Sequence, residues 1–285
     1  MKNLVILTIL TLYLGCDKID PPYQIDPEIN NSEKKILVEK FTGHKCSKCP
    51  KASRLLDEIK NIYPQIISVA IHPGSSGLTN VDNNHPYDFT TNSGDEISDY
   101  VGITSFIPLG TVNRRNGGIN NTKVFVKDDW EEEISNTLNI NDELVLPKVA
   151  INIDNEYDAI TKVLTIETRI TPLDTLNNQY KLCLFVMESG IISPQKDDEA
   201  ENGNTIDFQH DNIYRCAINS TFGEEVILDQ EISTKVQHTI TFNTENHPKW
   251  DTSWNNIENC DIVAYVYDKE TGEIEQAHKQ SVINE

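Results

Sequence analysis

The pattern of hydrophobic residues changes near residue 145, and no other feature of the chain constrains its fold as strongly. Before that point, strand-like apolar runs alternate with stretches of helical spacing, at 36–41, about 50–63, 66–72, about 94–101, 109–113 and about 128–139. After it, alternating and uniformly apolar runs follow one another between turn residues, which is typical of antiparallel strands. The sequence therefore predicts an α/β part followed by an all-β part.

The N-terminus has the features of an export signal. A lysine precedes an apolar run over 4–14, which fits a signal peptide and is too short to span a bilayer. The run ends at Gly15-Cys16, and this junction resembles the bacterial lipoprotein signal, in which the cysteine is lipidated. We therefore predict a signal peptide over 1–15, a lipid anchor on Cys16 and a proline-containing tether over 16–33. An ordinary secretory signal, in which Cys16 is incidental, stays open.

Acidic residues outnumber basic ones, with 45 Asp and Glu against 24 Lys and Arg, so the formal net charge is −21. Binding to a nucleic-acid backbone needs clustered Lys and Arg, and this balance therefore predicts no nucleic-acid partner. It also argues against electrostatic docking on anionic lipid. A lipid on Cys16 would attach the protein to a membrane without help from charge.

The segment Cys46-Ser47-Lys48-Cys49 lies between the first predicted strand and the first predicted helix. Unpaired N–H groups and the helix dipole at a helix N-terminus favour a thiolate over a thiol. The first cysteine of such a pair attacks a substrate disulfide, and the second resolves the mixed disulfide. We therefore predict thiol–disulfide exchange with protein substrates, with Cys46 as the nucleophile and Cys49 as the resolving thiol.

The same pair admits other interpretations. It could be an inert structural disulfide, half of a zinc site, or part of a copper site with His44 and His72. No second CxxC is present to complete a zinc site, and Pro50 stands where a c-type haem needs histidine. The chain also lacks a Gly-rich phosphate loop and an HExxH motif. We therefore predict no metal and no cofactor.

Pro108 precedes the strand predicted over 109–113. Thioredoxin-like domains place a cis-proline at the start of the strand that faces the CxxC, and Pro108 has this order in the chain. We therefore predict that Pro108 is cis and shapes a substrate groove beside Cys46. An ordinary trans proline that opens a strand is the alternative.

The segment from Glu39 to Pro50 resembles the EFTG-x-x-C-x-x-CP motif of a Bacteroidetes lipoprotein family, the outer membrane protein of twenty-eight kilodaltons family. Four later segments resemble further motifs of that family, at 69–72, 108–114, 210–215 and 263–268. The resemblance covers about residues 34–283. It implies a thioredoxin-like half, an immunoglobulin-like half and an outer-membrane location in the cell envelope, and it implies no settled activity.

Pattern and resemblance together predict an α/β thioredoxin-like domain over 34–144, followed by an all-β immunoglobulin-like antiparallel sandwich over 145–285. The predicted function is thiol–disulfide exchange by an outer-membrane lipoprotein. The alternative is a non-enzymatic binding or adhesion lipoprotein. Two departures favour this alternative, since Lys45 replaces the tryptophan that thioredoxins carry before the first cysteine, and Ser47-Lys48 replaces their Gly-Pro.

Three further cysteines lie in the predicted β part, so at most one pair can form among them. Cys183 lies in an apolar strand and is predicted to be a core residue. Cys216 and Cys260 form a possible bridge. The acidic segment 194–212 lacks the regular ligand spacing of a Ca²⁺ loop and is predicted to be a solvated loop, in which His210 is structural.

Overall fold

The computed structural model describes residues 33–103, 106–141, 143–176, 179–228, 232–242 and 256–283. The predicted signal peptide over 1–15, the predicted lipidation site Cys16 and all but the last residue of the predicted tether lie outside these ranges. Residues Asn31–Glu285 form one compact unit. None of the helices within the described ranges is long and apolar enough to cross a membrane.

The first elements form the predicted βαβ unit, with β1 (Ile36–Phe41), α1 (Cys49–Ile62) and β2 (Ile66–Ile71). Strands β1 and β2 are parallel, and they pair without a break along their length. Helix α1 tolerates Pro50 because the first helical turn needs no N–H from it. The predicted strands and helix are therefore confirmed to within one or two residues.

The next elements follow the predicted alternation, with α2 (Asn92–Val101), β3 (Leu109–Val112) and α3 (Trp130–Leu138). Thr91 caps α2 by accepting a hydrogen bond from the Gly94 N–H at 2.9 Å. Gly102 ends the helix with a φ of 85°, a conformation that favours glycine. A short hairpin, β4 (Asn139–Ile140) and β5 (Glu143–Leu144), follows α3.

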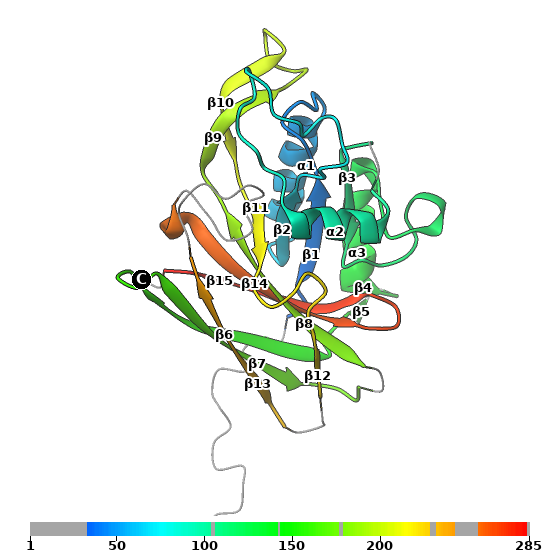
Figure 1. Ribbon diagram of the computed structural model, residues 1–285. Coiled ribbons are helices and arrows are strands. Elements are labelled where there is room, and N and C mark those ends of the chain that lie inside the picture. The colour runs from blue at the N-terminus through cyan, green and yellow to red at the C-terminus, as the bar shows by residue number, and fades with distance from the viewer. Residues whose placement is uncertain are drawn as a thin grey trace, which may run out of the picture. The chain divides into compact units, whose positions relative to one another are not determined.

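A large mixed sheet joins strands from both parts of the sequence (Figure 1). Its order is β15-β14-β8-β11-β2-β1-β3, and β12 also pairs with β8. The later strands of this sheet are β8 (Tyr180–Glu188), β11 (Ile213–Ala217), β12 (Glu224–Val226), β14 (Cys260–Asp268) and β15 (Ile274–Ser281). The junction of the two parts is parallel, where Ile213 of β11 lies beside Ala70 of β2.

The predicted fold class, an α/β thioredoxin-like domain followed by an all-β immunoglobulin-like sandwich, is therefore wrong. The described chain is mostly β, and β1, β2 and β3 share a mixed sheet with strands that follow residue 180. The reason is that hydrophobic periodicity identifies strands, whereas the choice of partner strand depends on contacts between distant residues. Strands β8 and β14 are buried along most of their length, as expected of strands inside a larger sheet.

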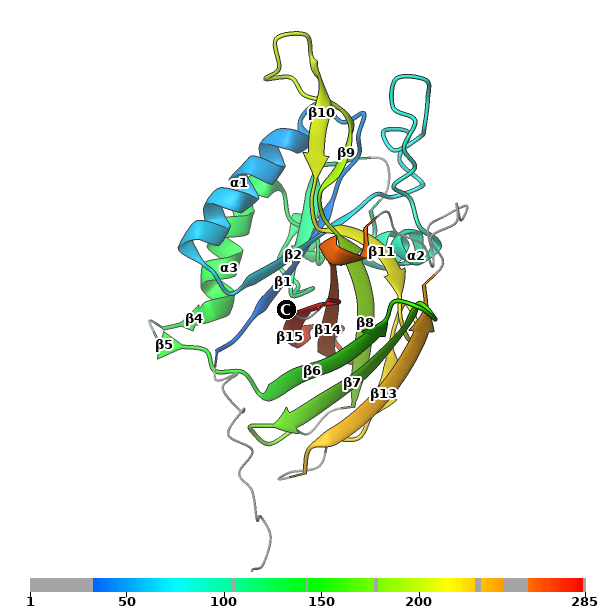
Figure 2. The ribbon, with the colours of Figure 1, turned by 90° about the vertical axis from the view of Figure 1, so that its left-hand side faces the viewer.

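A second, three-stranded antiparallel sheet has the order β13-β7-β6 (Figure 2). Its strands are β6 (Val149–Asp158), β7 (Val163–Pro172) and β13 (Thr234–Thr241). Because side chains alternate across a strand, β8 contributes to two cores. Leu182, Leu184 and Val186 belong to the core shared with this second sheet. The intervening residues Cys183, Phe185 and Met187 belong to a core that also includes side chains of α2.

A third core lies between the sheet and two helices. Helices α1 and α3 pack against the β1–β3 end of the large sheet, and Figure 2 shows α2 on the opposite side. Trp130 of α3 is fully buried in this core, next to Gly110 of β3. A Cβ atom at position 110 would lie 2.9 Å from the indole, so the helix can approach the strand this closely only beside glycine.

Candidate functional site

Cys46 and Cys49 form a disulfide at the start of α1, with their Cα atoms 5.4 Å apart. Only 4% of Cys46 and 1% of Cys49 are exposed. Cys49 is the first residue of the helix, and its N–H donates to the Cys46 carbonyl oxygen at 3.2 Å. Reactive cysteines normally lie in partly exposed surroundings, so a substrate could reach this disulfide only if the residues covering it moved.

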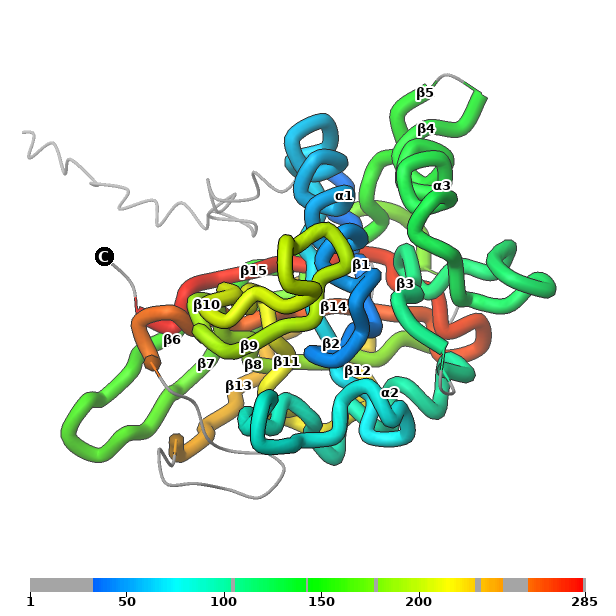
Figure 3. Tube along the Cα trace, turned by 90° about the horizontal axis from the view of Figure 1, so that it is seen from above, coloured from blue at the N-terminus to red at the C-terminus, as the bar shows by residue number. Residues whose placement is uncertain are grey.

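A hairpin made of β9 (Ile191–Lys196) and β10 (Asn204–His210) covers the cysteine segment on one side (Figures 1 and 3). Its backbone binds the backbone of that segment. The Lys196 N–H donates to the His44 carbonyl oxygen at 2.8 Å, and the Asp198 N–H donates to the Ser47 carbonyl oxygen at 3.0 Å. These bonds fix the hairpin to residues on either side of Cys46.

Gln195 adds a side-chain link between the hairpin and the disulfide. Its Nε2 atom donates to the carbonyl oxygens of Gly43 at 3.2 Å and Cys46 at 3.1 Å. The residue is 3% exposed, so these carbonyl groups have a buried partner in place of water. The prediction of a solvated loop over 194–212 is therefore wrong for the part that forms this hairpin.

Charged side chains tie the tip of the same hairpin to α1. The Arg54 guanidinium binds Asp197 at 3.0 and 3.3 Å and also pairs with Glu199. Lys51 lies 3.3 Å from Glu199. Burial opposes ionisation of Asp197, but the hydrogen bonds from Arg54 and the Glu199 N–H, together with the charge of Arg54, outweigh it and hold the pKa of this carboxyl below its usual value.

The loop over 73–91 also packs against the cysteine segment. The Lys45 N–H donates to the Leu78 carbonyl oxygen at 2.9 Å. A Cβ atom at position 43 would lie 2.7 Å from the same oxygen, so Gly43 permits this close approach of two backbones. The hairpin and this loop thus both hold the cysteine segment.

The structure brings the predicted site residues together. The Ile107–Pro108 peptide bond is cis, which confirms that prediction for Pro108. The Ile107 carbonyl oxygen lies 3.7 Å from the Sγ atom of Cys46. Cys46, Cys49 and the Ile107-Pro108 segment therefore share one site.

Three buried histidines surround Phe89 beside this site: His44, His72 and His210. The buried His85 stacks on His44. The Phe89 ring stacks on His72 with centroids 4.6 Å apart and lies 4.5 Å from the ring of His210. The His210 Nε2 atom lies 3.2 Å from the Ser193 carbonyl oxygen of the hairpin. The histidines therefore help to pack the hairpin onto the large sheet, in keeping with the structural role predicted for His210.

Burial keeps the imidazoles of His44, His72 and His210 neutral at pH 7. It lowers the pKa of His210 to about 4, and it also lowers the pKa values of His44 and His72. Within the described ranges, no group of three or more His, Cys, Asp or Glu residues is arranged to hold a metal ion. The phenyl ring of Phe89 lies against both His44 and His72, the pair considered for copper.

The other three cysteines of the described ranges, Cys183, Cys216 and Cys260, are buried and are not joined by disulfides. Cys183 is 2% exposed, which confirms its predicted place in a core, and burial raises its pKa to about 11. The possible bridge between Cys216 and Cys260 is absent. These residues lie on β11 and β14, which pair with opposite edges of β8, so a strand separates them.

No motif or periodicity in the sequence points to Gln195, Phe89 or His85 as residues of this site. Strand β9 does alternate between buried and exposed residues, but two of its inward residues, Ser193 and Gln195, are polar, so hydropathy does not reveal the alternation. Phe89 and His85 lie in the long loop over 73–91, and their contacts depend on the conformation of that loop. Hydrophobic periodicity does not predict the conformation of a loop.

The sequence profile of the family described as outer membrane protein Omp28 matches residues 95–285. This range includes Pro108 and begins after the cysteine pair. No curated protein sequence matches the chain.

Two solved structures from Porphyromonas gingivalis are similar to the chain. HBP35 has 15% identity and a TM-score of 0.63, over 88% of this chain and 76% of its own. A domain of the outer membrane lipoprotein Omp28 has 17% identity and a TM-score of 0.32, over 48% of this chain and 89% of its own. At 15% identity, the similarity to HBP35 shows that the two proteins share a fold, and it gives no information about activity.

Proposed function

Because the chain belongs to the outer membrane protein Omp28 family, which gives it an outer-membrane location, we propose that it acts there as a lipid-anchored, non-enzymatic binding protein. One observation carries this proposal: the Cys46–Cys49 disulfide is buried, and its segment is hydrogen-bonded to the backbone of both the hairpin and the loop. In this role the disulfide is a structural link that holds the start of α1 in the form that the hairpin binds.

The anchor in this proposal is a lipid on Cys16, attached after removal of residues 1–15. A radiolabelled or clickable fatty acid fed to the native cells should label the protein. We expect a Cys16→Ala variant to lose the label and to leave the outer-membrane fraction. Label that persists in this variant would place the acyl group elsewhere.

The binding role is tested by complementation of a deletion strain. A Cys46→Ser/Cys49→Ser double variant should correct the deletion phenotype as fully as the wild-type gene does, provided that immunoblots show equal amounts of protein. The wild-type gene and the empty vector give the two reference levels. If the double variant is folded and present in equal amount but inactive, the cysteines take part in the chemistry and the binding role is wrong.

Thiol–disulfide exchange is the second candidate, and the position of the cysteine pair at a helix N-terminus beside Ile107-Pro108 favours it. In that reaction the Cys46 thiolate attacks a substrate disulfide and expels one substrate thiolate. The Cys49 thiolate then attacks the Cys46 sulfur and releases the second. Two electrons pass to the substrate, the Cys46–Cys49 disulfide re-forms, and a cellular dithiol must reduce it again. Pro108 would shape the groove for the substrate.

A Cys49→Ser variant separates the two candidates, because it cannot resolve a mixed disulfide. Exchange predicts discrete high-mass species on non-reducing gels of native cells, and these should be absent in Cys46→Ser/Cys49→Ser cells. The binding role predicts the same gel pattern for both variants.

A further inference from the structure

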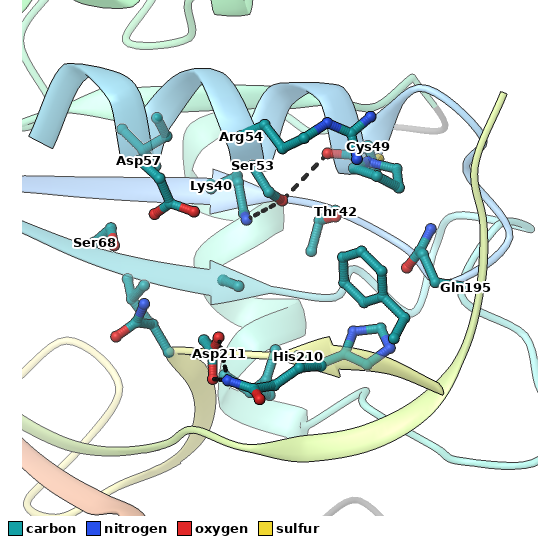
Figure 4. A pocket seen from close by; sticks show the side chains of 18 residues that line it. Lys40, Thr42, Cys49, Ser53, Arg54, Asp57, Ser68, Gln195, His210 and Asp211 are labelled. Carbon is teal, nitrogen blue, oxygen red and sulfur yellow. Dashed lines mark hydrogen bonds between the residues drawn. The ribbon is translucent and has the colours of Figure 1, made fainter. Parts of the chain in front are cut away.

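A cavity of about 120 Å³ lies next to the disulfide, beneath α1 (Figure 4). Its lining comes from the β1, β2 and α1 region, from the β9–β10 hairpin, and from residues 211–213, where the chain enters β11. Strands β2 and β11 pair at only one position, Ala70 with Ile213, so most of this edge of β2 is not paired with β11. The lining is rich in polar side chains, among them Lys40, Thr42, Ser53, Ser68 and Asn212.

Lys40 is the central polar group of this cavity. It lies on β1, with its side chain directed toward α1 (Figure 4). Its Nζ atom donates to the Ser53 Oγ atom at 2.6 Å, and Ser53 in turn donates to the Cys49 carbonyl oxygen at 3.2 Å. An ammonium group has three donors. Within the described part of the chain, Ser53 accepts one of them and no carboxylate pairs with the group.

The other charged residues of the lining have protein partners. Arg54 is bound to the carboxylates of the hairpin tip. Asp211 accepts hydrogen bonds from the Gly190 N–H at 2.8 Å and from Gln209 at 3.0 Å. Asp57 is mostly exposed, and Lys60 lies 3.9 Å from it. Lys40 is therefore the lining cation that is available to an anion.

The same aspartates restrict which anion can enter. Asp57 and Asp211 add negative charge to the lining, which disfavours a phosphate or sulfate dianion more than a monoanion. Burial lowers the pKa of Lys40 to about 8, so the group is mostly protonated at pH 7 but poorly solvated. A bound monoanion would offset this loss of solvation.

We propose that this cavity binds a small monocarboxylate, whose oxygens accept hydrogen bonds from the Lys40 ammonium. The inference rests on the binding role proposed above and names a ligand class for it. A cavity of this size admits a few non-hydrogen atoms, such as a short-chain fatty acid. The neighbouring Ser53 holds the ammonium in place through its own bond to the first turn of α1.

The test is an NMR titration of the purified chain that begins at residue 17, with sodium acetate or propionate as the probe and ionic strength held constant with chloride. Saturable shifts are expected at the amides of Ser53, Ser68 and Asn212. Lys40→Met should weaken the fitted affinity roughly tenfold or more, since it removes a charge-assisted hydrogen bond. Lys51→Met, on the exposed side of the same helix, should leave the affinity unchanged.

Sodium sulfate is the second probe, and it should give much smaller shifts at these amides. Because Lys40→Met could disturb folding, Ser53→Ala provides a milder variant, with an expected weakening of about two- to fivefold. Equal affinity of the wild type and Lys40→Met, equal response to sulfate, or the absence of saturation would each overturn the proposal. Such a result would not affect complementation by the double cysteine variant, so failure of this site and failure of the binding role can be told apart.

Discussion

The two ends of the large sheet are built in different ways. At one end, β1 and β2 are parallel neighbours joined by α1, so residues close in sequence form the pairing. At the other end, β8 and β14 are antiparallel neighbours separated by a long stretch of chain and covered by the three-stranded sheet. Local pattern is therefore enough to build the first end, whereas the second forms only when strands distant in sequence meet.

A buried charged network nevertheless joins the two ends. Arg114 is fully buried and binds Glu39 of β1, with Nε 2.9 Å from Oε2. The same guanidinium donates to the Tyr265 hydroxyl of β14 at 3.0 Å. Thr111 of β3 donates to Glu39 at 2.8 Å. Strands from both ends of the sheet therefore share one set of hydrogen bonds.

The largest effect is expected from separating the two parts of the chain. Fragments 34–144 and 145–285 correspond to the predicted domains, and that division is still a prediction. Because β2 pairs with β11 and the core beside α2 draws on both fragments, we expect neither to unfold cooperatively alone. Circular dichroism during urea denaturation measures this. A cooperative transition in either isolated fragment would show that it is an independent domain.

The next largest effect is expected from Arg114→Met. This change leaves Glu39 buried without its charged partner, so the free energy of unfolding should fall by about 3–5 kcal/mol. The adjacent Arg115 is partly exposed and pairs with Glu133, so Arg115→Met should cost less than about 1 kcal/mol. Urea denaturation of both variants gives the comparison. Similar losses would mean that the network does not join the two ends.

An acid-dependent loss of stability is expected at the cysteine end of the sheet. The pKa of His210 falls from 6.5 to about 4 on folding, so between these values the unfolded chain binds a proton that the folded chain does not. Stability should therefore drop as pH falls from 6.5 to 4, by roughly 3 kcal/mol from this residue. His210→Gln should reduce the slope of unfolding free energy against pH in this window. An unchanged slope would contradict the assignment.

The smallest effect is expected from removing the disulfide. A Cys46→Ser/Cys49→Ser variant should lose about 2 kcal/mol, because the closed loop is short. The loss should be local, so hydrogen exchange should accelerate at the Lys196 and Asp198 amides and stay unchanged in β7 and β13. Faster exchange throughout the protein would show that the disulfide stabilises both ends of the sheet.

Sequence reasoning succeeded where residues near one another decide the structure. Helix α1 was expected at about 50–63 and spans Cys49–Ile62, and Pro108 is cis as expected. The pairing of β2 with β11 was not foreseen, because Ala70 and Ile213 carry no pattern that identifies them as partners. The uniformly apolar runs of β8 and β14 are typical of strands inside a larger sheet. Because the neighbouring segments of the sequence alternate between apolar and polar residues, all of these strands were predicted to form a sandwich.

The candidate site divides in the same way. The disulfide, the helix N-terminus and Pro108 were predictable, since each follows from a short motif. The covering hairpin was not, because the hydrogen bonds from Gln195 and Lys196 to the cysteine segment join parts of the chain that are far apart.

The place of β2 in the sheet order has a consequence for how the chain is made. Ala70 leaves the ribosome long before Ile213, so until β11 arrives Ala70 has no partner on that edge of β2. An unpaired strand edge can pair with another chain, and all six residues of β2 are buried in the folded protein. We expect newly exported protein to aggregate most readily in this interval, and a periplasmic chaperone that covers strand edges to raise its yield.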